Sequence, residues 1–108
     1  MDEIILTKED NDSSLIVNRG DTLRIILQEN PTTGYTWQVD GELPPQLKEV
    51  SSEQKKTYKG SLGGAGKRIL DFSIEATGKA KLSLKYWQPW SGETSVSERF
   101  CVSLEIEK

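Results

Sequence analysis

The sequence predicts an all-β protein, a sandwich of two packed sheets with about seven to eight strands. Apolar and polar residues alternate over several short runs, as on strands with one buried face. Turn-forming residues separate these runs at the short spacing typical of a β-sandwich. The one segment that could form a helix, residues 47–58, lacks the wide apolar stripe of an amphipathic helix.

The alternation predicts inward-facing side chains on five strands. Because successive side chains of a strand point to opposite faces, each set shares one face, and these faces must cover one another. In chain order the sets are Leu23, Ile25 and Leu27; Tyr35, Trp37 and Val39; Leu70, Phe72 and Ile74; Ala80, Leu82, Leu84 and Tyr86; and Phe100, Val102, Leu104 and Ile106.

The polar segment at residues 47–58 is the ambiguous part of the pattern. It carries several lysines and glutamates and fits either a short exposed helix or an irregular edge strand. We favour the edge strand, because short charged edges prevent sheets of different molecules from pairing.

Length and composition indicate one domain over residues 1–108. The chain has 34% apolar and 29% charged residues and a net charge of −3, which describes a soluble globular monomer. Lysines and arginines are outnumbered and do not cluster, so we expect no nucleic-acid partner. The apolar run near the N-terminus is too short for a signal peptide or a membrane span, so we expect no membrane and a cytoplasmic location. The single Cys101 fits a reduced thiol.

The chain contains no histidine, which argues against an enzyme. The usual Ser-His, Cys-His and His-metal arrangements cannot form without it. Acidic residues mostly fall on the polar phase of strands or in charged loops, where solvation explains them. The glycine-rich residues 60–68 lack the spacing of a phosphate-binding loop. We therefore expect no catalytic residues, no metal and no cofactor.

A six-residue segment between two predicted strands is the most informative part of the sequence. Pro31 fixes its own φ and favours extended geometry before it, whereas Gly34 permits a sharp or left-handed turn. The two threonines between them are stiff at χ1, so we expect a preorganised tip whose hydroxyls could bond in a narrow polar cleft. A plain turn is the alternative, since these residue types are common in turns. This first motif comprises Asn30, Pro31, Thr32, Thr33, Gly34 and Tyr35.

Three of the eight aromatic residues lie within five positions near residue 90. Tyr86 continues the inward phase of its strand and is predicted to join the core. Trp90 lies beyond Pro89 and is predicted to be exposed, as an anchor of the kind enriched at interface hot spots. Trp37, in the middle of a strand, is predicted to be buried like the core tryptophan of immunoglobulin domains.

Two further segments complete a pattern with the first motif. The second motif is Gly63, Gly64, Ala65 and Gly66, and the third motif is Gln88, Pro89 and Trp90. Together, in this order and spacing, the three motifs resemble those of the chagasin family, protein inhibitors of papain-like cysteine peptidases. The family pattern has glycine where Ala65 stands, and it usually has arginine where Gln88 stands.

The resemblance implies an immunoglobulin-like β-sandwich that closes the cleft of a papain-like cysteine peptidase with three loops, reversibly and without a covalent bond. By motif position, Thr32 and Thr33 would lie near the catalytic cysteine of the peptidase. The second motif would follow the non-primed side of the cleft, and Pro89 and Trp90 would pack on the primed side. We expect the three loops at one end of an up-and-down sandwich.

Two other functions remain open from the residues alone. A β-sandwich module that binds carbohydrate or protein would use Tyr58, Trp87 and Trp90 as stacking platforms, but it gives no role to the first motif. A purely structural immunoglobulin-like domain is the third possibility.

Overall fold

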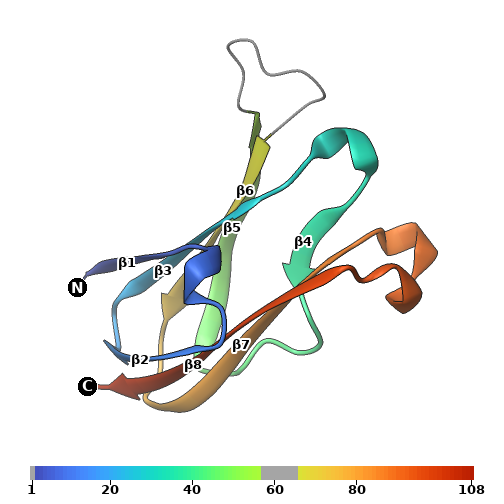
Figure 1. Cartoon of the computed structure of the whole chain (residues 1–108). Helices are drawn as coiled ribbons and strands as arrows, with labels where there is room; N and C mark the ends of the chain where they lie inside the picture. Colours follow the sequence, from blue (N-terminus) through green and yellow to red (C-terminus); the bar gives the residue numbers. More distant parts are fainter. Residues whose placement is uncertain (1, 57–65) are drawn as a thin grey trace.

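The computed structural model describes residues 2–56 and 66–108, which form two four-stranded β-sheets packed face to face (Figure 1). This confirms the predicted all-β sandwich. The strands are β1 (Glu3–Leu6), β2 (Ser13–Asn18), β3 (Thr22–Gln28), β4 (Thr36–Val39), β5 (Leu47–Lys56), β6 (Gly66–Ile74), β7 (Gly78–Trp87) and β8 (Glu98–Glu107).

The helical elements of the described residues are four single 3-10 turns, and none is long enough to cross a membrane. They lie in connections between strands: η1 (Lys8–Asp10), η2 (Pro31–Thr33), η3 (Pro89–Ser91) and η4 (Glu93–Ser95). Two of them, η2 and η3, overlap the first and third motifs. The motifs therefore form compact turns that project from the strands.

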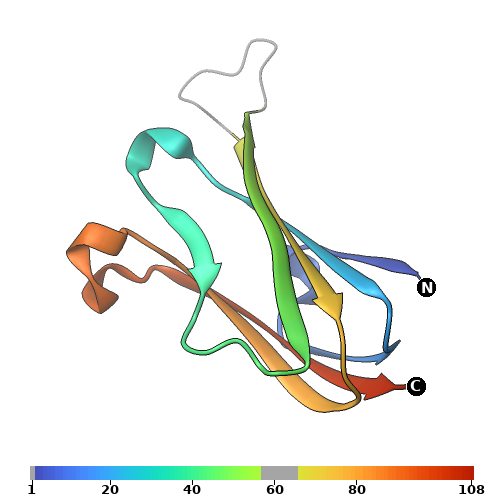
Figure 2. The ribbon, with the colours of Figure 1, turned by 180° about the vertical axis from the view of Figure 1, so that it is seen from behind.

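The strand order is β1-β3-β6-β5 in one sheet and β2-β8-β7-β4 in the other. The pairs β1–β3 and β2–β8 are parallel, and the remaining neighbours are antiparallel. The expected up-and-down connectivity is therefore wrong. Consecutive strands repeatedly change sheet, as β3, β4 and β5 do, because their connections cross from one layer to the other. This crossing brings the first motif over the edge between the sheets (Figure 2).

The core lies between the sheets and contains most of the predicted inward side chains. Trp37 is a member of this core, and Phe72 and Phe100 are the largest of its fully buried side chains. Burying one such side chain stabilises the fold by roughly 1.5–3 kcal/mol. Three predicted members, Tyr35, Val39 and Tyr86, are only partly buried because they lie at the margin of the sandwich.

The predicted edge strand at residues 47–58 is confirmed over residues 47–56, which form β5, and its last two residues lie outside the described residues. Among the described strands, the one sheet partner of β5 is β6. The pairing register of β5 shifts between Glu49 and Ser51, so the exposed Val50 occupies a bulge. Bulges and charges on an edge strand discourage pairing with another molecule.

The acidic residues were predicted to be mostly solvated, and two of them are exceptions: Asp21 and Glu29 are buried at opposite ends of β3. Asp21 accepts hydrogen bonds from the backbone N–H groups of Asp2 and Asn18, each at 2.9 Å. These bonds hold the pKa of Asp21 below its usual range, since they favour the ionised form. Asp21 therefore ties the N-terminal segment to the β2–β3 turn, at the end of the molecule away from the motifs.

Candidate functional site

The first motif forms the short 3-10 turn η2, with the backbone geometry expected from its residues. Asn30 precedes the turn in an extended conformation, with φ −98° and ψ 108°. Gly34 ends the turn in the left-handed region at φ +78°. Both conformations confirm what proline and glycine predicted at this place.

Hydrogen bonds inside the first motif make its tip rigid. The Oδ1 atom of Asn30 accepts from both the backbone N–H and the hydroxyl of Thr32, at 3.0 and 2.7 Å. The hydroxyl of Thr33 donates to the carbonyl oxygen of Asn30 at 2.9 Å. In the free protein both hydroxyls therefore donate within the loop, one to the side chain and one to the backbone of Asn30. Their bonding in the cleft of a partner stays a prediction. The tip is preorganised before any partner arrives.

The third motif forms the 3-10 turn η3, which the following serine-rich segment supports. Gln88 donates its backbone N–H to the hydroxyl oxygen of Ser95 at 2.9 Å, and that hydroxyl lies 2.7 Å from the carbonyl oxygen of Gly92. The indole of Trp90 is 72% exposed, which confirms the prediction for this residue. An exposed tryptophan on a turn braced by hydrogen bonds is suited to contact a partner.

The first and third motifs lie against each other at the end of the molecule opposite the termini (Figures 1 and 2). The Nε2 atom of Gln88 donates to the carbonyl oxygen of Thr33 at 3.1 Å. The indole of Trp90 lies so close to Gly34 that a Cβ atom on residue 34 would overlap its ring. Two loops more than 50 residues apart in sequence thus form one continuous surface.

An aromatic stack supports this surface from below. The ring of Tyr86 stacks on Trp37 with centroids 5.0 Å apart, and it meets the tilted ring of Tyr35 at 5.3 Å. The Tyr86 hydroxyl oxygen also accepts the backbone N–H of Asn30 at 3.2 Å. Tyr86 therefore packs against the margin of the core beneath the first motif and is only half-buried, because its hydroxyl needs a polar partner there.

Most of the second motif, Gly63, Gly64 and Ala65, lies outside the described residues. Its last residue, Gly66, is buried and begins β6. The carbonyl oxygen of Gly66 accepts the backbone N–H of Glu29 at 3.0 Å. The end of the second motif is therefore joined directly to the residue that precedes the first motif.

Glu29 is a site residue that the sequence analysis missed. Its side chain is completely buried, and its carboxylate accepts hydrogen bonds from four residues: Thr36, Trp37, Gln54 and Arg68. We call Glu29 and these four residues the Glu29 cluster. The signal for it was present, because residue 29 continues the inward phase of Leu23, Ile25 and Leu27. A carboxylate on the buried phase of a strand requires such partners.

Burial by itself would raise the pKa of Glu29, but the bonds that its carboxylate accepts have a larger combined effect. The guanidinium of Arg68, the N–H of Trp37 and the amide of Gln54 together hold the pKa of Glu29 below its usual range. The carboxylate is therefore ionised at neutral pH. An ionised group buried in this way keeps its partners close to it.

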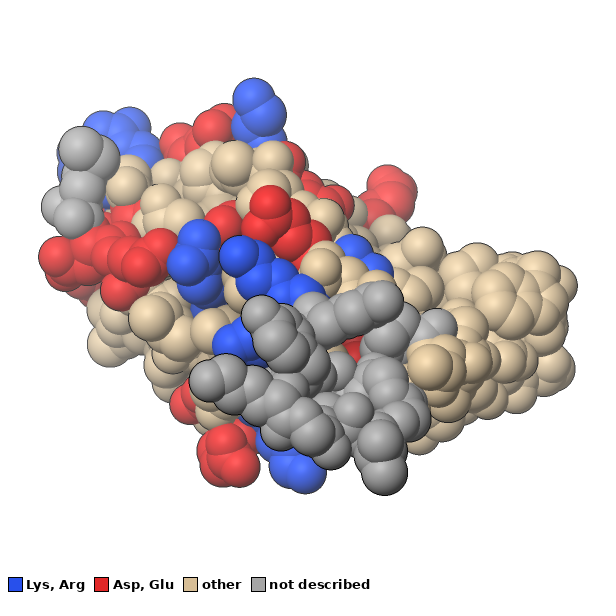
Figure 3. All heavy atoms as spheres, turned by 90° about the horizontal axis from the view of Figure 1, so that it is seen from above, with Lys and Arg blue, Asp and Glu red and all other residues tan. Residues whose placement is uncertain are grey.

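Neither the first nor the third motif contains a charged side chain. In a view from above, one end of the molecule shows neither basic nor acidic atoms (Figure 3). Charges begin behind the third motif, where Lys85 lies 2.8 Å from Glu93 and 3.7 Å above the ring of Trp87. The surface that the two motifs form is therefore hydroxylated and aromatic, with ion pairs at its base.

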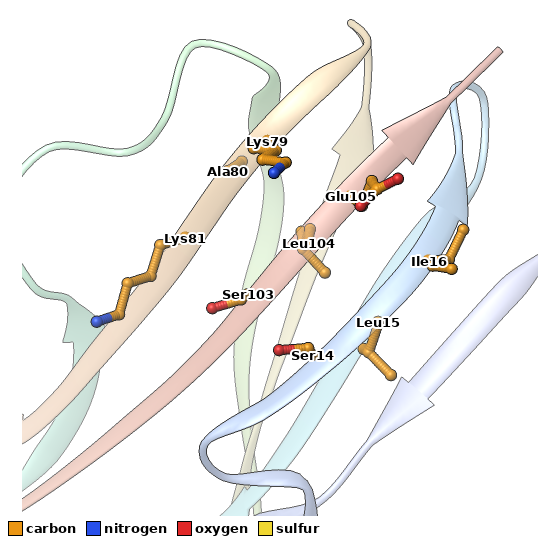
Figure 4. Close-up of a pocket in the computed structure, with 9 residues that line it drawn as sticks. All are labelled: Ser14, Leu15, Ile16, Lys79, Ala80, Lys81, Ser103, Leu104 and Glu105. Carbon is orange, nitrogen blue, oxygen red and sulfur yellow. The ribbon is translucent and has the colours of Figure 1, made fainter.

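A broad hollow lies elsewhere, on the outer face of β2, β8 and β7 (Figure 4). It has a volume of about 670 Å³ and is wide open to solvent. Its lining mixes the exposed Ile16 with Lys79, Lys81 and Glu105 and contains no residue of any motif. The candidate site is thus a projecting surface and not a pocket. In the described residues, no group of three or more acidic, cysteine or histidine side chains could hold a metal ion.

Comparisons with known proteins agree with this arrangement. Residues 16–104 match a family model described as Chagasin family peptidase inhibitor I42. Chagasin of Trypanosoma cruzi is 32% identical over 108 residues, covering 93% of this chain and 94% of the relative. Amoebiasin-1 of Entamoeba histolytica is 34% identical over 87 residues, covering 80% of this chain and 83% of the relative.

Solved structures show the same fold. The cysteine protease inhibitor EhICP2 from Entamoeba histolytica superimposes with a TM-score of 0.88 at 24% identity, covering 99% of this chain and 97% of that one. PbICP-C, determined in complex with falcipain-2, superimposes with a TM-score of 0.59 at 22% identity, covering 97% of this chain and 89% of that one.

Proposed function

The chain belongs to the chagasin family of peptidase inhibitors, and we propose that it inhibits papain-like cysteine peptidases by filling their active-site cleft. The first and third motifs enter the cleft together, and the second motif contacts its non-primed side. Inhibition is reversible and forms no covalent bond with the peptidase.

One observation carries this proposal. The indole of Trp90 rests on Gly34 while remaining 72% exposed, so a large apolar group and the hydroxylated tip are presented as one rigid edge. A rigid edge loses little conformational entropy on binding, which is what makes inhibitors of this kind tighter than flexible peptides.

The chemistry of the tip suits a cysteine peptidase. Such a site holds a thiolate and an imidazolium in a groove and attacks the carbonyl carbon of an extended peptide. The first motif presents a compact 3-10 turn, in which the side chain of Asn30 and the carbonyl oxygen of Asn30 hold the two threonines. A turn closed in this way fills the groove without offering an extended bond for cleavage.

The size of the contact allows tight binding. Protease–inhibitor pairs typically bury about 1,600 Å² in total, and three neighbouring loops can supply a surface of this order. Trp90 is the expected anchor, and the uncharged contacts around it exclude water. Nanomolar or tighter binding is consistent with such an interface.

A carbohydrate-binding role is less well supported by the geometry. Trp87 is unsuited to stack on a sugar, because Lys85 covers one face of its ring and its Nε1 atom donates to Gln38 at 3.0 Å. Tyr58 lies outside the described residues. Of the two platforms that the structure describes, Trp90 is then the one that remains available to a sugar.

The direct test is to titrate active papain with the purified protein and to measure residual turnover of a small substrate. We expect activity to fall to zero near one inhibitor per active site, and to return when the complex is diluted. A glycan array with the same protein should show no binding. Full turnover of papain in an excess of folded protein would contradict the proposed function.

We also propose that the protein acts in the cytosol. Its one cysteine, Cys101, is unpaired and half-buried, and its sulfur lies 3.4 Å from the hydroxyl oxygen of Ser83. An unpaired thiol of this kind persists in a reducing compartment. Cell fractionation tests the location, and recovery of the protein only in vesicles would contradict it.

A further inference from the structure

We propose that Glu29 is a positioning residue for inhibition, because its buried carboxylate fixes the first motif against β5 and β6. The tip and these two strands then approach the peptidase as one body. This inference rests on the proposed function and concerns how the inhibitory surface is held in place.

The contacts of Glu29 reach both ends of the first motif. Its Oε1 atom accepts the backbone N–H of Trp37 at 2.9 Å and lies 3.2 Å from the hydroxyl oxygen of Thr36. Glu29 itself directly precedes Asn30, where the motif begins. One carboxylate therefore joins the residue before the motif to the residues after it, which closes the loop at its base.

The other oxygen of Glu29 joins this base to the neighbouring strands. Its Oε2 atom accepts from Gln54 of β5 at 2.6 Å and from the Nη2 atom of Arg68 of β6 at 2.7 Å. Arg68 also donates to Thr36 at 3.1 Å, so the guanidinium bridges the same elements a second time. The Glu29 cluster thus links three strands around the base of the tip.

The charges in the cluster make this link strong and costly to break. The carboxylate is completely buried and the Arg68 side chain is 17% exposed, so water screens their attraction little. Removing the carboxylate takes away the acceptor of the buried N–H of Trp37 and the counter-charge of Arg68, which is more damaging than losing a bond at the surface. A neutral residue at position 29 should therefore loosen the base of the first motif and not only lower global stability.

Asp21 provides a matched control at the other end of β3. It is also a buried carboxylate, 3% exposed, and it accepts hydrogen bonds from two backbone N–H groups. Both donors, Asp2 and Asn18, lie outside the first motif and the Glu29 cluster. Asp21→Asn should therefore reduce stability without altering the inhibitory surface.

The experiment compares Glu29→Gln with Asp21→Asn and with the original chain under conditions in which all three are folded. Each protein is measured for its inhibition constant against papain, for its urea midpoint, and for amide hydrogen exchange. We expect Glu29→Gln to raise the inhibition constant about tenfold or more, mainly through faster dissociation. Its amide exchange at Thr33 and Trp37 should also accelerate. Asp21→Asn should leave both the inhibition constant and the exchange at these two residues unchanged.

Two results would overturn the inference: an unchanged inhibition constant for folded Glu29→Gln, or equal weakening by both variants at equal loss of stability. The exchange measurement needs no peptidase, so it tests the positioning role even if the original chain fails to inhibit papain.

If Glu29→Gln does not fold, Gln54→Ala provides the second test, because Gln54 is exposed on the edge strand. That variant removes the link to β5 alone. It should weaken inhibition about threefold, by the contribution of a single hydrogen bond, and accelerate exchange at Trp37. The absence of both effects would also overturn the inference.

Discussion

The indole of Trp90 lies directly on Gly34, so that no side chain larger than a hydrogen atom fits at position 34. Gly34 also has a φ of +78°, a conformation that other L-residues adopt at a cost of about 1 kcal/mol or more. The glycine therefore serves two purposes, turning the chain and admitting the ring. This contact makes two distant loops behave as one surface.

Gly34→Ala should weaken inhibition much more than its effect on stability explains. The added methyl group meets the ring of Trp90 and must displace it. Gly41→Ala is the matched control, because Gly41 has the same φ of +78° and a methyl group added there would have open space around it. Urea unfolding should show similar losses for both variants, and papain inhibition should fall about tenfold or more for Gly34→Ala alone. Equal inhibition constants for the two would contradict the role of the contact.

Trp90→Ala should weaken binding by about 2 kcal/mol, which is roughly 30-fold. The loss should appear mainly in the dissociation rate, because an anchor that is buried in the complex chiefly determines how long the complex lasts. Surface plasmon resonance on an immobilised, inactivated peptidase measures the association and dissociation rates. Ile16→Ala is the control, since Ile16 is 71% exposed on β2, away from the motifs. An unchanged dissociation rate for folded Trp90→Ala would place the anchor elsewhere.

Gln88→Leu should weaken inhibition several-fold, by roughly 1 kcal/mol, the usual contribution of one hydrogen bond. The variant keeps the size of the side chain but loses the donor to the Thr33 carbonyl oxygen. Gln38→Leu is the control, because it breaks the comparable bond from Trp87 on the outer face of β4. We expect weaker inhibition for Gln88→Leu only. If both variants inhibit as the original chain does, the bond between the motifs has no part in binding.

Stability should be constant between about pH 5 and 8 and fall below about pH 4, where carboxylates take up protons. A hydrogen bond from Arg24 holds the pKa of Asp71 below its usual range. The hydrogen bonds that Glu29 accepts outweigh the effect of its burial and also hold its pKa below the usual range. A group whose pKa is lower in the folded state stabilises it above the unfolded pKa, and this contribution disappears as the pH falls through the folded pKa. Urea midpoints across this range measure the effect, and a decline from pH 8 to 5 would contradict it.

The chain contains no histidine, the residue that usually titrates near neutral pH. We therefore expect the pH dependence of inhibition between about pH 5 and 8 to come from the peptidase. A peptidase variant with a disabled active-site pair should bind with almost the same constant across this range. A steep change with that variant would reveal a titrating group on the inhibitor.

Dissociation of the complex should depend little on salt. The first and third motifs carry no charged residue, so salt has no ion pair to screen where they make contact. Dissociation rates measured in increasing sodium chloride should stay constant, whereas association can change with the overall charge. A rate that rises steeply with salt would show that ion pairs dominate the interface.

Local features of the structure follow closely from the sequence. The alternation predicted the inward faces and the burial of Trp37, which is 5% exposed. The charged segment at residues 47–58 was predicted as an edge strand, and its described part, residues 47–56, is one. Proline and glycine predicted the extended and left-handed conformations at Asn30 and Gly34. These predictions succeeded because side-chain period and backbone sterics act over a few neighbouring residues.

Only the tertiary structure decided which loops meet and which polar groups are buried together. Trp90 and Gly34 are 56 residues apart, and Glu29 meets Arg68 across two paired strands. The first contact depends on how the connections cross between the sheets, and the second depends on the pairing of β3 with β6. No local pattern contains that information. The sequence therefore determined the strands and the shape of the first motif. The packing of the two sheets determined that this motif, Trp90 and a buried carboxylate form one rigid site.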